Sequence, residues 1–576
     1  MNSVSVTGKN WILQKFDQEK IVYLKDNFFL DEIIAKLLVL RNINKKDVNS
    51  FLNPSIKDIL PNPENLLDMK KTSLRMIDVI KNKEKIGVFG DYDVDGASST
   101  ALLGKFFNEL NLQYDFYIPD RKTEGYGPSI KGFKELINKN VKIIFTVDCG
   151  TLSYEAIDFA KSKQIDVVVL DHHQSEIKLP NAFSVINPNR LDDKSDLKYL
   201  CAAGVTFMFL VSINKYLRSI NWFKKNSISE PNLINYLDLV SLGTVCDVVP
   251  LIGLNRAIVK QGLKILKFKK NLGIKTLLDV CKIETTPSTY HLGYILGPRI
   301  NAGGRVGKCS HGANLLLGKN PKSSFKLASE LDQYNKERQI LEKDLLQKIL
   351  NETKDYSNDP VLILSGKNWH EGIIGIVAAR LKDKFNKPVI LISIEGDTGK
   401  ASARSIVGFD IGSIIISATQ DNILLKGGGH KMAGGFSIKV EKIDEFKKFV
   451  FKKFKTINED LSKDKPLFLD SIISPSAVNL EFFNKVSLLS PFGSGNPEPR
   501  FVIEDVKTIN GKIVGEKHIK SILVGKDGSS IKTIAFNAIG GDLGEYLLKK
   551  NNKLFNIAGK LSLNEWKGQS NVEFII

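Results

Sequence analysis

The chain has 576 residues, 42% of them hydrophobic, and is long enough for several domains with apolar cores. Its 82 Lys and Arg residues exceed its 64 Asp and Glu residues, and the formal charge of +18 favours polyanionic partners such as nucleic acid. Five scattered cysteines without a Cys-x-x-Cys pair exclude a zinc ribbon or a disulfide framework. No apolar run approaches the ~20 residues of a membrane span, and the N-terminus lacks the apolar core of a signal peptide. We therefore expect a cytoplasmic protein without a membrane partner.

The first part of the chain reads as an arm followed by an α/β domain. Residues 1–45 have a polar start and then a helical pattern over Phe29–Leu40, which predicts a lead-in arm. From residue 46 to residue 322, strand-like apolar runs alternate with helical stretches. This alternation is typical of βαβ units and predicts a mostly parallel sheet.

Three aspartates follow the first strand-like run of that domain. Ile86–Gly90 reads as a buried parallel strand, and Asp91, Asp93 and Asp95 come after it at alternate positions. Ligands of open α/β sheets bind at this end of the strands, and three carboxylates so close together need a counter-charge such as a divalent cation. A solvated acidic turn is the alternative. A calcium loop of the EF-hand type is excluded, because the position of its last ligand is Leu102.

Two further apolar runs end in polar side chains. Val141–Val147 precedes Asp148. Ile165–Leu170 precedes Asp171 and then the tandem histidines His172 and His173. Carboxylate together with imidazole is typical of Mn²⁺ or a similar transition metal, whereas oxygen ligands alone favour Mg²⁺ or Ca²⁺. The pattern predicts a metal site at the strand ends.

The second half of the chain indicates two more domains. Residues 323–355 have helical apolar spacing without Gly or Pro, which predicts a long connecting helix between two lobes. Apolar strands and a glycine-rich stretch predict a smaller α/β domain over residues 356–458. Short alternating runs with Gly turns and many lysines over residues 465–576 fit a small β-barrel of the OB type.

The Asp-Tyr-Asp-Val-Asp-Gly turn with Asp171-His172-His173 resembles the DHH phosphoesterase superfamily and, within it, the RecJ family of single-strand-specific DNA exonucleases. Several other stretches are similar to that family's motifs: Ile118–Arg121, Glu124–Gly127, Ser241–Asp247, Gly297–Arg305, Trp369–Gly372, Gly427–His430 and Pro491–Pro499. The resemblance implies a DHH catalytic domain over 46–322, a DHH-associated (DHHA1) substrate domain over 356–458 and a nucleic-acid-binding OB domain over 465–576.

The resemblance also implies a set of metal ligands for two Mn²⁺ or Mg²⁺ ions. The implied ligands are Asp91, Asp93, Asp95, Asp148, His172 and Asp247. Asp148 is the candidate to bridge the two ions, and Asp91 either binds metal or supports the turn. His173 belongs to the implied catalytic set, where it contacts the scissile phosphate or a supporting acid.

Phosphate recognition needs fixed donors, which arginine forks and the backbone N–H groups of glycines supply. The residues that the resemblance implies for this role are Arg121, Arg299, Asn301, Arg305, Ser402, Arg404, Gly428, Gly429 and His430. The stretch from Ser402 to Arg404 resembles a pocket for a 5′ phosphate, although Ala401 stands where relatives have Gly. Trp566 and Phe536 are candidates to stack bases, with a place in a core as the alternative.

The function that the resemblance implies is a metal-dependent 5′→3′ exonuclease. It would hydrolyse single-stranded DNA to 5′-mononucleotides in DNA repair and recombination, as a monomer, with a helicase and a single-strand-binding protein as suggested partners. One alternative is a small-substrate DHH phosphodiesterase acting on oligoribonucleotides, 3′-phosphoadenosine phosphate or cyclic dinucleotides, but such enzymes usually lack the barrel. The other is a non-catalytic single-strand-binding scaffold, which the intact set of acids and histidines disfavours.

Overall fold

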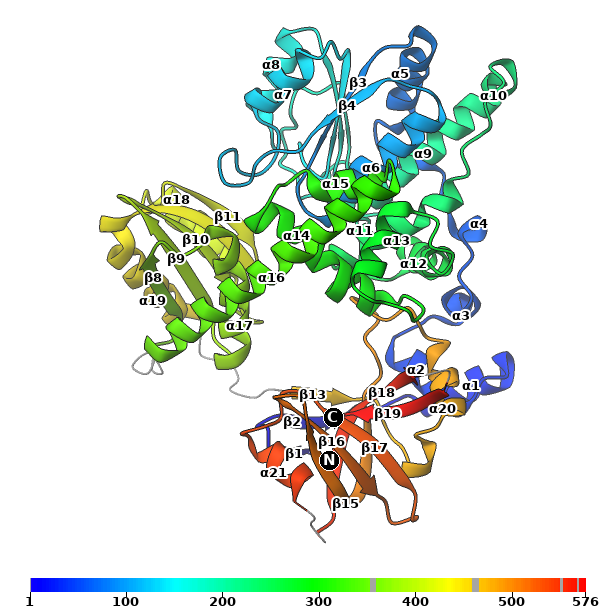
Figure 1. The fold of residues 1–576 in the computed structure, drawn as a ribbon, viewed down its shortest axis with the longest axis vertical. Coiled ribbons are helices and arrows are strands. Elements are labelled where there is room, and N and C mark those ends of the chain that lie inside the picture. The colour runs from blue at the N-terminus through cyan, green and yellow to red at the C-terminus, as the bar shows by residue number, and fades with distance from the viewer. Residues whose placement is uncertain (1, 353–358, 458–465, 550–552, 567–568) are drawn as a thin grey trace.

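The computed structural model describes residues 2–352, 359–457, 466–549, 553–566 and 569–576. The chain forms three parts, and one long helix joins the first two (Figure 1). We call them the first lobe (residues 54–320), the second lobe (359–457) and the C-terminal unit (the described residues of 2–53 and 466–576). None of the described helices combines the length and the hydropathy that a membrane span requires.

A five-stranded parallel sheet in the order β4-β3-β5-β6-β7 forms the centre of the first lobe. Its strands are β3 (Ile86–Gly90), β4 (Tyr114–Tyr117), β5 (Ile143–Val147), β6 (Asp166–Leu170) and β7 (Ser184–Ile186). The three strands predicted from the sequence are confirmed, because each is a short apolar run buried on both faces.

Helices cover both faces of this sheet. Helices α7 (Ile130–Ile137) and α8 (Tyr154–Ser162) pack on the face that carries Phe89, whereas α5 (Met69–Asn82), α6 (Val94–Glu109) and α9 (Ala202–Ser219) pack on the opposite face. The chain runs from β3 out to β4 and then returns to β5 on the other side of β3. This reversal is a topological switch point, the place where open α/β sheets bind ligands.

The rest of the first lobe is helical, which differs from the prediction of strands as far as residue 322. Beyond β7, the chain forms α9, α10 (Trp222–Lys225), α11 (Leu237–Cys246), α12 (Gly253–Leu266), α13 (Leu272–Val280), a π-helix (His291–Leu296), α14 (Gly297–Val306) and α15 (His311–Leu317). The apolar run that begins α11 is buried on every side, residues 237–244 without exception. Such a run has no amphipathic period and therefore resembles a buried strand in the sequence.

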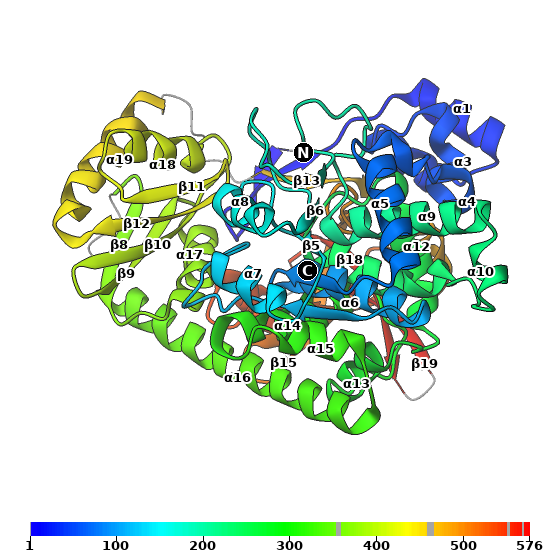
Figure 2. The ribbon, with the colours of Figure 1, turned by 90° about the horizontal axis from the view of Figure 1, so that it is seen from above.

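Helix α16 (Pro321–Glu352) confirms the predicted connecting helix and runs along the side of both lobes (Figure 2). The second lobe has a five-stranded sheet in the order β11-β12-β10-β9-β8. Its elements are β8 (Leu362–Lys367), α17 (Glu371–Phe385), β9 (Val389–Glu395), β10 (Thr398–Arg404), α18 (Ile411–Gln420), β11 (Lys426–His430), β12 (Ala433–Lys439) and α19 (Ile443–Ile457).

Both ends of the chain meet in the C-terminal unit (Figure 1). Strand β2 (Asn10–Leu13) pairs with β1 (Asn2–Val4) and, in parallel, with β13 (Pro466–Leu469). Helices α1 (Gln18–Phe28), α2 (Glu32–Leu40) and α3 (Val48–Leu52) share a hydrophobic core with the C-terminal strands. The N-terminal segment is thus part of the unit at the other end of the sequence.

The strands of this unit form one ladder in the order β14-β15-β16-β17-β19-β18, and β18 pairs in addition with β15. Its remaining elements are β14 (Ser471–Ile472), α20 (Leu480–Ser487), β15 (Phe501–Val514), β16 (His518–Val524), β17 (Ser530–Ala535), α21 (Asp542–Leu548), β18 (Phe555–Trp566) and β19 (Gln569–Ile575).

Candidate metal centre and phosphate pocket

The acidic loops after β3 and β5 meet at the switch point of the first sheet. Asp93 caps α6, because its Oδ1 accepts a hydrogen bond from the backbone N–H of Gly96 at 3.0 Å. Asp148 follows β5 with a φ of 61°, a left-handed conformation that aspartate tolerates better than most residues. Asp91 and Asp148 are both almost fully buried. The strand ends thus direct carboxylates toward one point.

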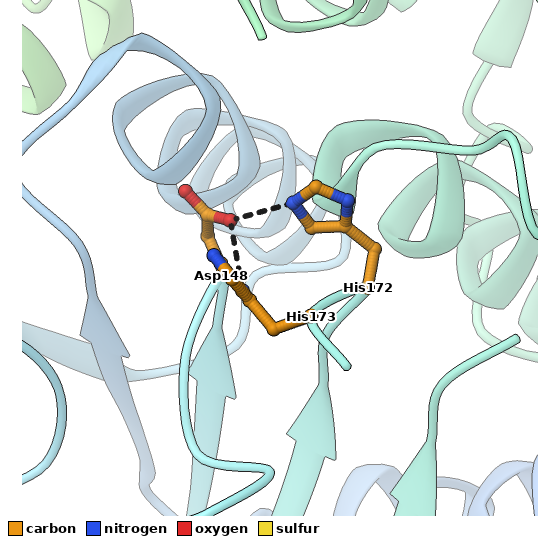
Figure 3. A group of neighbouring side chains, drawn as sticks. All are labelled: Asp148, His172 and His173. Atoms are coloured by element: carbon orange, nitrogen blue, oxygen red, sulfur yellow. Dashed lines mark ion pairs between the residues drawn. The ribbon is translucent and has the colours of Figure 1, made fainter. Parts of the chain in front are cut away.

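Asp171 orients the two histidines after β6. Its Oδ1 lies 2.7 Å from Nδ1 of His173 and accepts the backbone N–H of His172 at 2.8 Å. Its Oδ2 accepts from the hydroxyl of Thr151 at 2.6 Å. Because Asp171 is saturated in this way, it supports the histidines, and His172 is directed at Asp148 (Figure 3).

Two further acids complete the cluster from helices. The carboxylate of Asp95 accepts the backbone N–H groups of Ala202 and Ala203, at 2.6 and 2.9 Å, and so lies at the N-terminus of α9. Asp247 follows the C-terminus of α11, and its Oδ2 lies 3.6 Å from Nε2 of His172. The structure therefore brings all six implied ligands to one site.

The donor atoms of this cluster fit divalent cations. They form three overlapping groups whose ligand atoms lie within 4.8 Å of one another: Asp91, Asp93 and Asp148; Asp95, His172 and Asp247; and Asp148, His172 and His173. Three buried atoms of the cluster lack a hydrogen-bond partner among the described residues, namely Asp91 Oδ1, His172 Nε2 and Asp247 Oδ2. Buried acceptors without donors are costly, and a metal ion would satisfy them.

The pKa shifts of the cluster also favour binding of a cation. Burial, followed by the charges of neighbouring aspartates, raises the pKa of Asp91 and Asp148 well above its usual range and that of Asp247 to about 9. Burial lowers the pKa of His172. For His173 the lowering by burial is outweighed by the Asp171 carboxylate, which raises its pKa to about 9.

A cavity of about 270 Å³ adjoins the cluster, and cationic and polar side chains line it together with the aspartates. Its lining residues are Asp91, Tyr92, Asp93, Arg121, Tyr126, Asp148, His173, Asp247, Asn301 and Arg305. The guanidinium of Arg121 lies over the ring of Tyr92, 5.2 Å from its centroid. A cavity lined by both carboxylates and arginines suits a metal-bound phosphate.

The second lobe contacts Arg305, one of the residues that line this cavity. Arg305 donates Nη1 to the carbonyl of Gly372 at 3.0 Å, and a Cβ at Gly372 would come within 2.7 Å of the Arg305 carbonyl oxygen. Burial, followed by the charge of Arg121, lowers the pKa of Arg305 to about 10 and also lowers that of Arg404. No carboxylate among the described residues forms an ion pair with these three arginines. Besides burial, the charge of Arg121 lowers the pKa of the other two, so an anion such as phosphate would be a favourable partner for all three.

Other implied phosphate ligands lie elsewhere. Arg299 pairs with Asp332 of α16 at 2.9 Å and is absent from the cavity wall. Ser402 accepts from Arg404 Nη1 at 3.2 Å on β10. Gly428, Gly429 and His430 form β11, paired with β12, and none of them lines the cavity. Phe536 is half exposed and contacts His518 edge-on, and the side chain of Trp566 lies outside the described residues.

The sequence reasoning assigned no role to Tyr126, although it lies in the Glu-Gly-Tyr-Gly stretch. Its hydroxyl donates to the carbonyl of Asp148 at 2.9 Å and lies 3.1 Å from Nδ1 of His173. It also lines the cavity. The two flanking glycines, both at positive φ, are the sequence signal for an exposed side chain on a tight loop.

Three family models match the chain. They are the DHH family, N-terminal domain over residues 85–244, the DHHA1 domain over residues 358–456 and the RecJ OB domain over residues 469–576. The expected fold class is thus confirmed, with a parallel-sheet DHH domain, a DHHA1 domain and a C-terminal OB domain. Together with the cluster at the strand ends, these matches define a phosphoesterase of the DHH class.

The relatives narrow this class. The single-stranded-DNA-specific exonuclease RecJ of Escherichia coli (strain K12) is 34% identical over 544 residues, which cover 91% of this chain and 92% of that protein. RecJ of Bacillus subtilis (strain 168) is 29% identical over 98% of this chain and 70% of that protein. The crystal structure of RecJ in complex with Mn²⁺ from Thermus thermophilus matches with a TM-score of 0.79 and 25% identity, over 98% of this chain and 78% of that one. The chain belongs to the RecJ family.

Proposed function

We propose that this protein is a metal-dependent exonuclease that hydrolyses single-stranded DNA from its 5′ end to 5′-mononucleotides, in DNA repair and recombination. The observation that carries the proposal is the convergence of six ligand-type side chains, four of which line a cavity that Arg121 and Arg305 also line. The RecJ OB domain supports a nucleic acid strand as the substrate, and the names of the relatives support DNA and an exonuclease.

Two divalent ions, Mn²⁺ or Mg²⁺, are proposed to be held by Asp91, Asp93, Asp95, Asp148, His172 and Asp247. Asp148 is the proposed bridge, because it belongs to two of the three ligand groups and, unlike His172, which also belongs to two, it offers two carboxylate oxygens. When bound, such a pair activates water and neutralises charge on the phosphoryl oxygens. Asp95 keeps the cluster aligned with the N-terminus of α9 through its two backbone hydrogen bonds.

The arginines are proposed to hold the phosphates. Arg121 and Arg305, with Asn301, line the cavity beside the acidic cluster and would bind the scissile phosphate there. Arg404, beside Ser402, would bind the terminal 5′ phosphate from the second lobe. Binding of the terminal 5′ phosphate at a fixed site would place the next phosphodiester bond at the metal cluster. This supports the 5′→3′ direction and the mononucleotide product.

His173 is proposed to serve the departing 3′ oxygen. Asp171 contacts Nδ1 of His173, so Nε2, which lies 3.3 Å from the hydroxyl of Tyr126, is the nitrogen proposed to face a substrate. The Asp171 carboxylate raises the pKa of His173 to about 9, against the effect of burial, and this ring therefore retains a proton at neutral pH. The Tyr126 hydroxyl and the Asp171 carboxylate both lie close to Nδ1 of this ring, at 3.1 and 2.7 Å, and so hold its orientation.

The test is a digest of single strands labelled at either end, with Mn²⁺, with Mg²⁺ and with a chelator. Release of labelled mononucleotide from the 5′ end alone, only with metal, is the expected result. Release from the 3′ end would refute the direction, and cleavage of dinucleotides but not of long strands would favour the small-substrate enzyme. Binding of long strands with no hydrolysis at all would favour the scaffold. Gel filtration with and without a helicase or a single-strand-binding protein tests the proposed monomer and its partners.

A further inference from the structure

Arg256 of α12 is a fully buried arginine of the first lobe whose partners all belong to the C-terminal unit. Its side chain is 1% exposed. Nε donates to the carbonyl of Phe51 at 2.7 Å, and the guanidinium lies over the Phe51 ring, 3.8 Å from its centroid. The two Nη atoms donate to three successive carbonyls, those of Leu489, Ser490 and Pro491, at 2.9, 2.9 and 3.3 Å.

These carbonyls lie in a loop that the C-terminal unit holds rigidly. We call Leu489–Pro497 the junction loop. Asn496, itself buried, donates its Nδ2 to the carbonyls of Leu489 and Pro491, both at 2.8 Å. Arg41 of the same unit donates to Oδ1 of Asn496 and to the carbonyl of Pro497, both at 2.8 Å. The acceptors that Arg256 meets are therefore fixed before the two parts dock.

The contact between the Arg256 guanidinium and these carbonyls favours one orientation of the C-terminal unit relative to the first lobe. No carboxylate among the described residues pairs with Arg256, so carbonyl dipoles and the face of the Phe51 ring compensate its buried charge. A small displacement of the loop would leave a cation buried without acceptors, which is strongly unfavourable. The planar fork of a guanidinium can satisfy several carbonyls at once, which a lysine ammonium cannot do.

Further contacts hold the C-terminal unit against the first lobe. The backbone N–H of Leu251 donates to the carbonyl of Ser494 at 2.8 Å. Gly495 has a φ of 72°, and a Cβ there would come within 3.1 Å of Pro250. One turn after Arg256, Lys260 donates its Nζ to the carbonyl of Leu52 at the C-terminal end of α3. Backbone groups thus dominate the polar contacts of this junction.

We propose that Arg256 is a positioning residue that locks the C-terminal unit onto the catalytic lobe at one orientation. A strand held by that unit then reaches the cavity along a single path. The proposal rests on the function proposed above, because it concerns how a long strand is presented to that site. It predicts that loss of Arg256 lets the unit move while the catalytic residues stay in place.

The test compares full-length Arg256→Met and Arg256→Lys proteins with the wild type. Small-angle scattering should give an enlarged radius of gyration for both variants, because the C-terminal unit samples several orientations. With Mn²⁺ present, KM for a long 5′-phosphorylated strand should rise roughly tenfold, as expected when two linked binding elements lose their fixed geometry. The kcat for a short oligonucleotide, which does not span to the C-terminal unit, should stay within about twofold of wild type.

Leu278→Ala is the matched control, because it truncates a buried side chain of α13 away from the junction. It should lower thermal stability without changing the scattering or the long-strand KM. If Arg256→Met and Arg256→Lys behave like this control, Arg256 is merely structural and the proposal is overturned. If the methionine variant does not fold, the lysine variant alone decides. An inactive wild type would refute the proposed function, while the scattering comparison would still decide the role of Arg256.

Discussion

Nε2 of His172 lies 3.3 Å from Oδ1 of Asp148, and the Asp148 side chain is buried while that of His172 is 13% exposed. Burial has opposite effects on the two groups, since it lowers the pKa of the imidazole and raises that of the carboxyl group. A positive partner between them, either a proton or a metal ion, would relieve both effects. Metal and protons should therefore compete for this site.

This competition predicts that metal binding depends on pH. The folded-state pKa of Asp247 is raised to about 9, so this group retains a proton near neutral pH and must release it to bind metal, and the raised pKa of Asp91 and of Asp148 acts in the same direction. Affinity for Mn²⁺ should rise between pH 6 and pH 8. Calorimetric titrations in two buffers of different ionisation enthalpy should detect net proton release. Affinity that is flat across this range would contradict the assigned ligands.

Asp148→Asn should abolish hydrolysis while DNA binding persists. Asparagine tolerates the left-handed φ of 61° at this position, so the change removes charge with little backbone strain. The loss of turnover should exceed about 100-fold, the upper end for residues that only support a metal ligand. Steady-state rates and binding of an uncleavable strand are the measurements. Asp158→Asn, at an exposed position of α8, is the matched control and should behave like wild type.

Asp171→Asn should impair catalysis by releasing His173 rather than by removing a ligand. Burial lowers the pKa of His173, but the Asp171 carboxylate, with smaller effects of Asp247 and Asp93, raises it to about 9, so the loss of Asp171 should lower that pKa. NMR titration of the metal-free protein can follow the ring directly. Activity should fall about 10–100-fold, the range for residues that orient metal-site histidines. An unchanged His173 pKa would show that this pairing is absent in solution.

Arg404→Ala should reduce the preference for a 5′-phosphorylated strand. A hydrogen bond to a charged group contributes about 1.5–3 kcal/mol, so the ratio of kcat/KM with and without the phosphate should fall roughly 10–100-fold. Arg380→Ala offers a control in the same lobe, because Arg380 is exposed and pairs with Glu342 of α16, which keeps Arg338 as a second partner. An unchanged ratio in the Arg404 variant would remove this residue from the phosphate site.

Local patterns in the sequence were sufficient to predict the strands that carry the metal ligands. The runs before Asp91, Asp148 and Asp171 are short, apolar and buried on both faces, and parallel strands of this kind place their carboxyl ends along one edge. The ligand set itself came from the resemblance to the DHH superfamily. The geometry of the six side chains agrees with it, and their role as ligands stays a prediction.

Relationships between distant segments could not be predicted in this way. Nothing in the first 45 residues identifies β13 or the C-terminal strands as their packing partners. Arg299 and Arg305 lie in one motif with equivalent chemistry, yet Asp332 of α16 pairs with the first and leaves the second facing the cavity. Such differences depend on which residues the fold brings next to each arginine, and the spacing of residues in the sequence does not predict these neighbours.

The shared core of the two chain ends has a consequence for biosynthesis. Ile21, Leu24 and Ile34 emerge from the ribosome first, yet the apolar surface that covers them, including Phe501 and Ile503, is made several hundred residues later. At about 5–20 residues per second, that interval lasts tens of seconds. The nascent N-terminus therefore carries uncovered hydrophobic helices while the lobes behind it fold, and a holding chaperone at that stage should raise the yield of native protein.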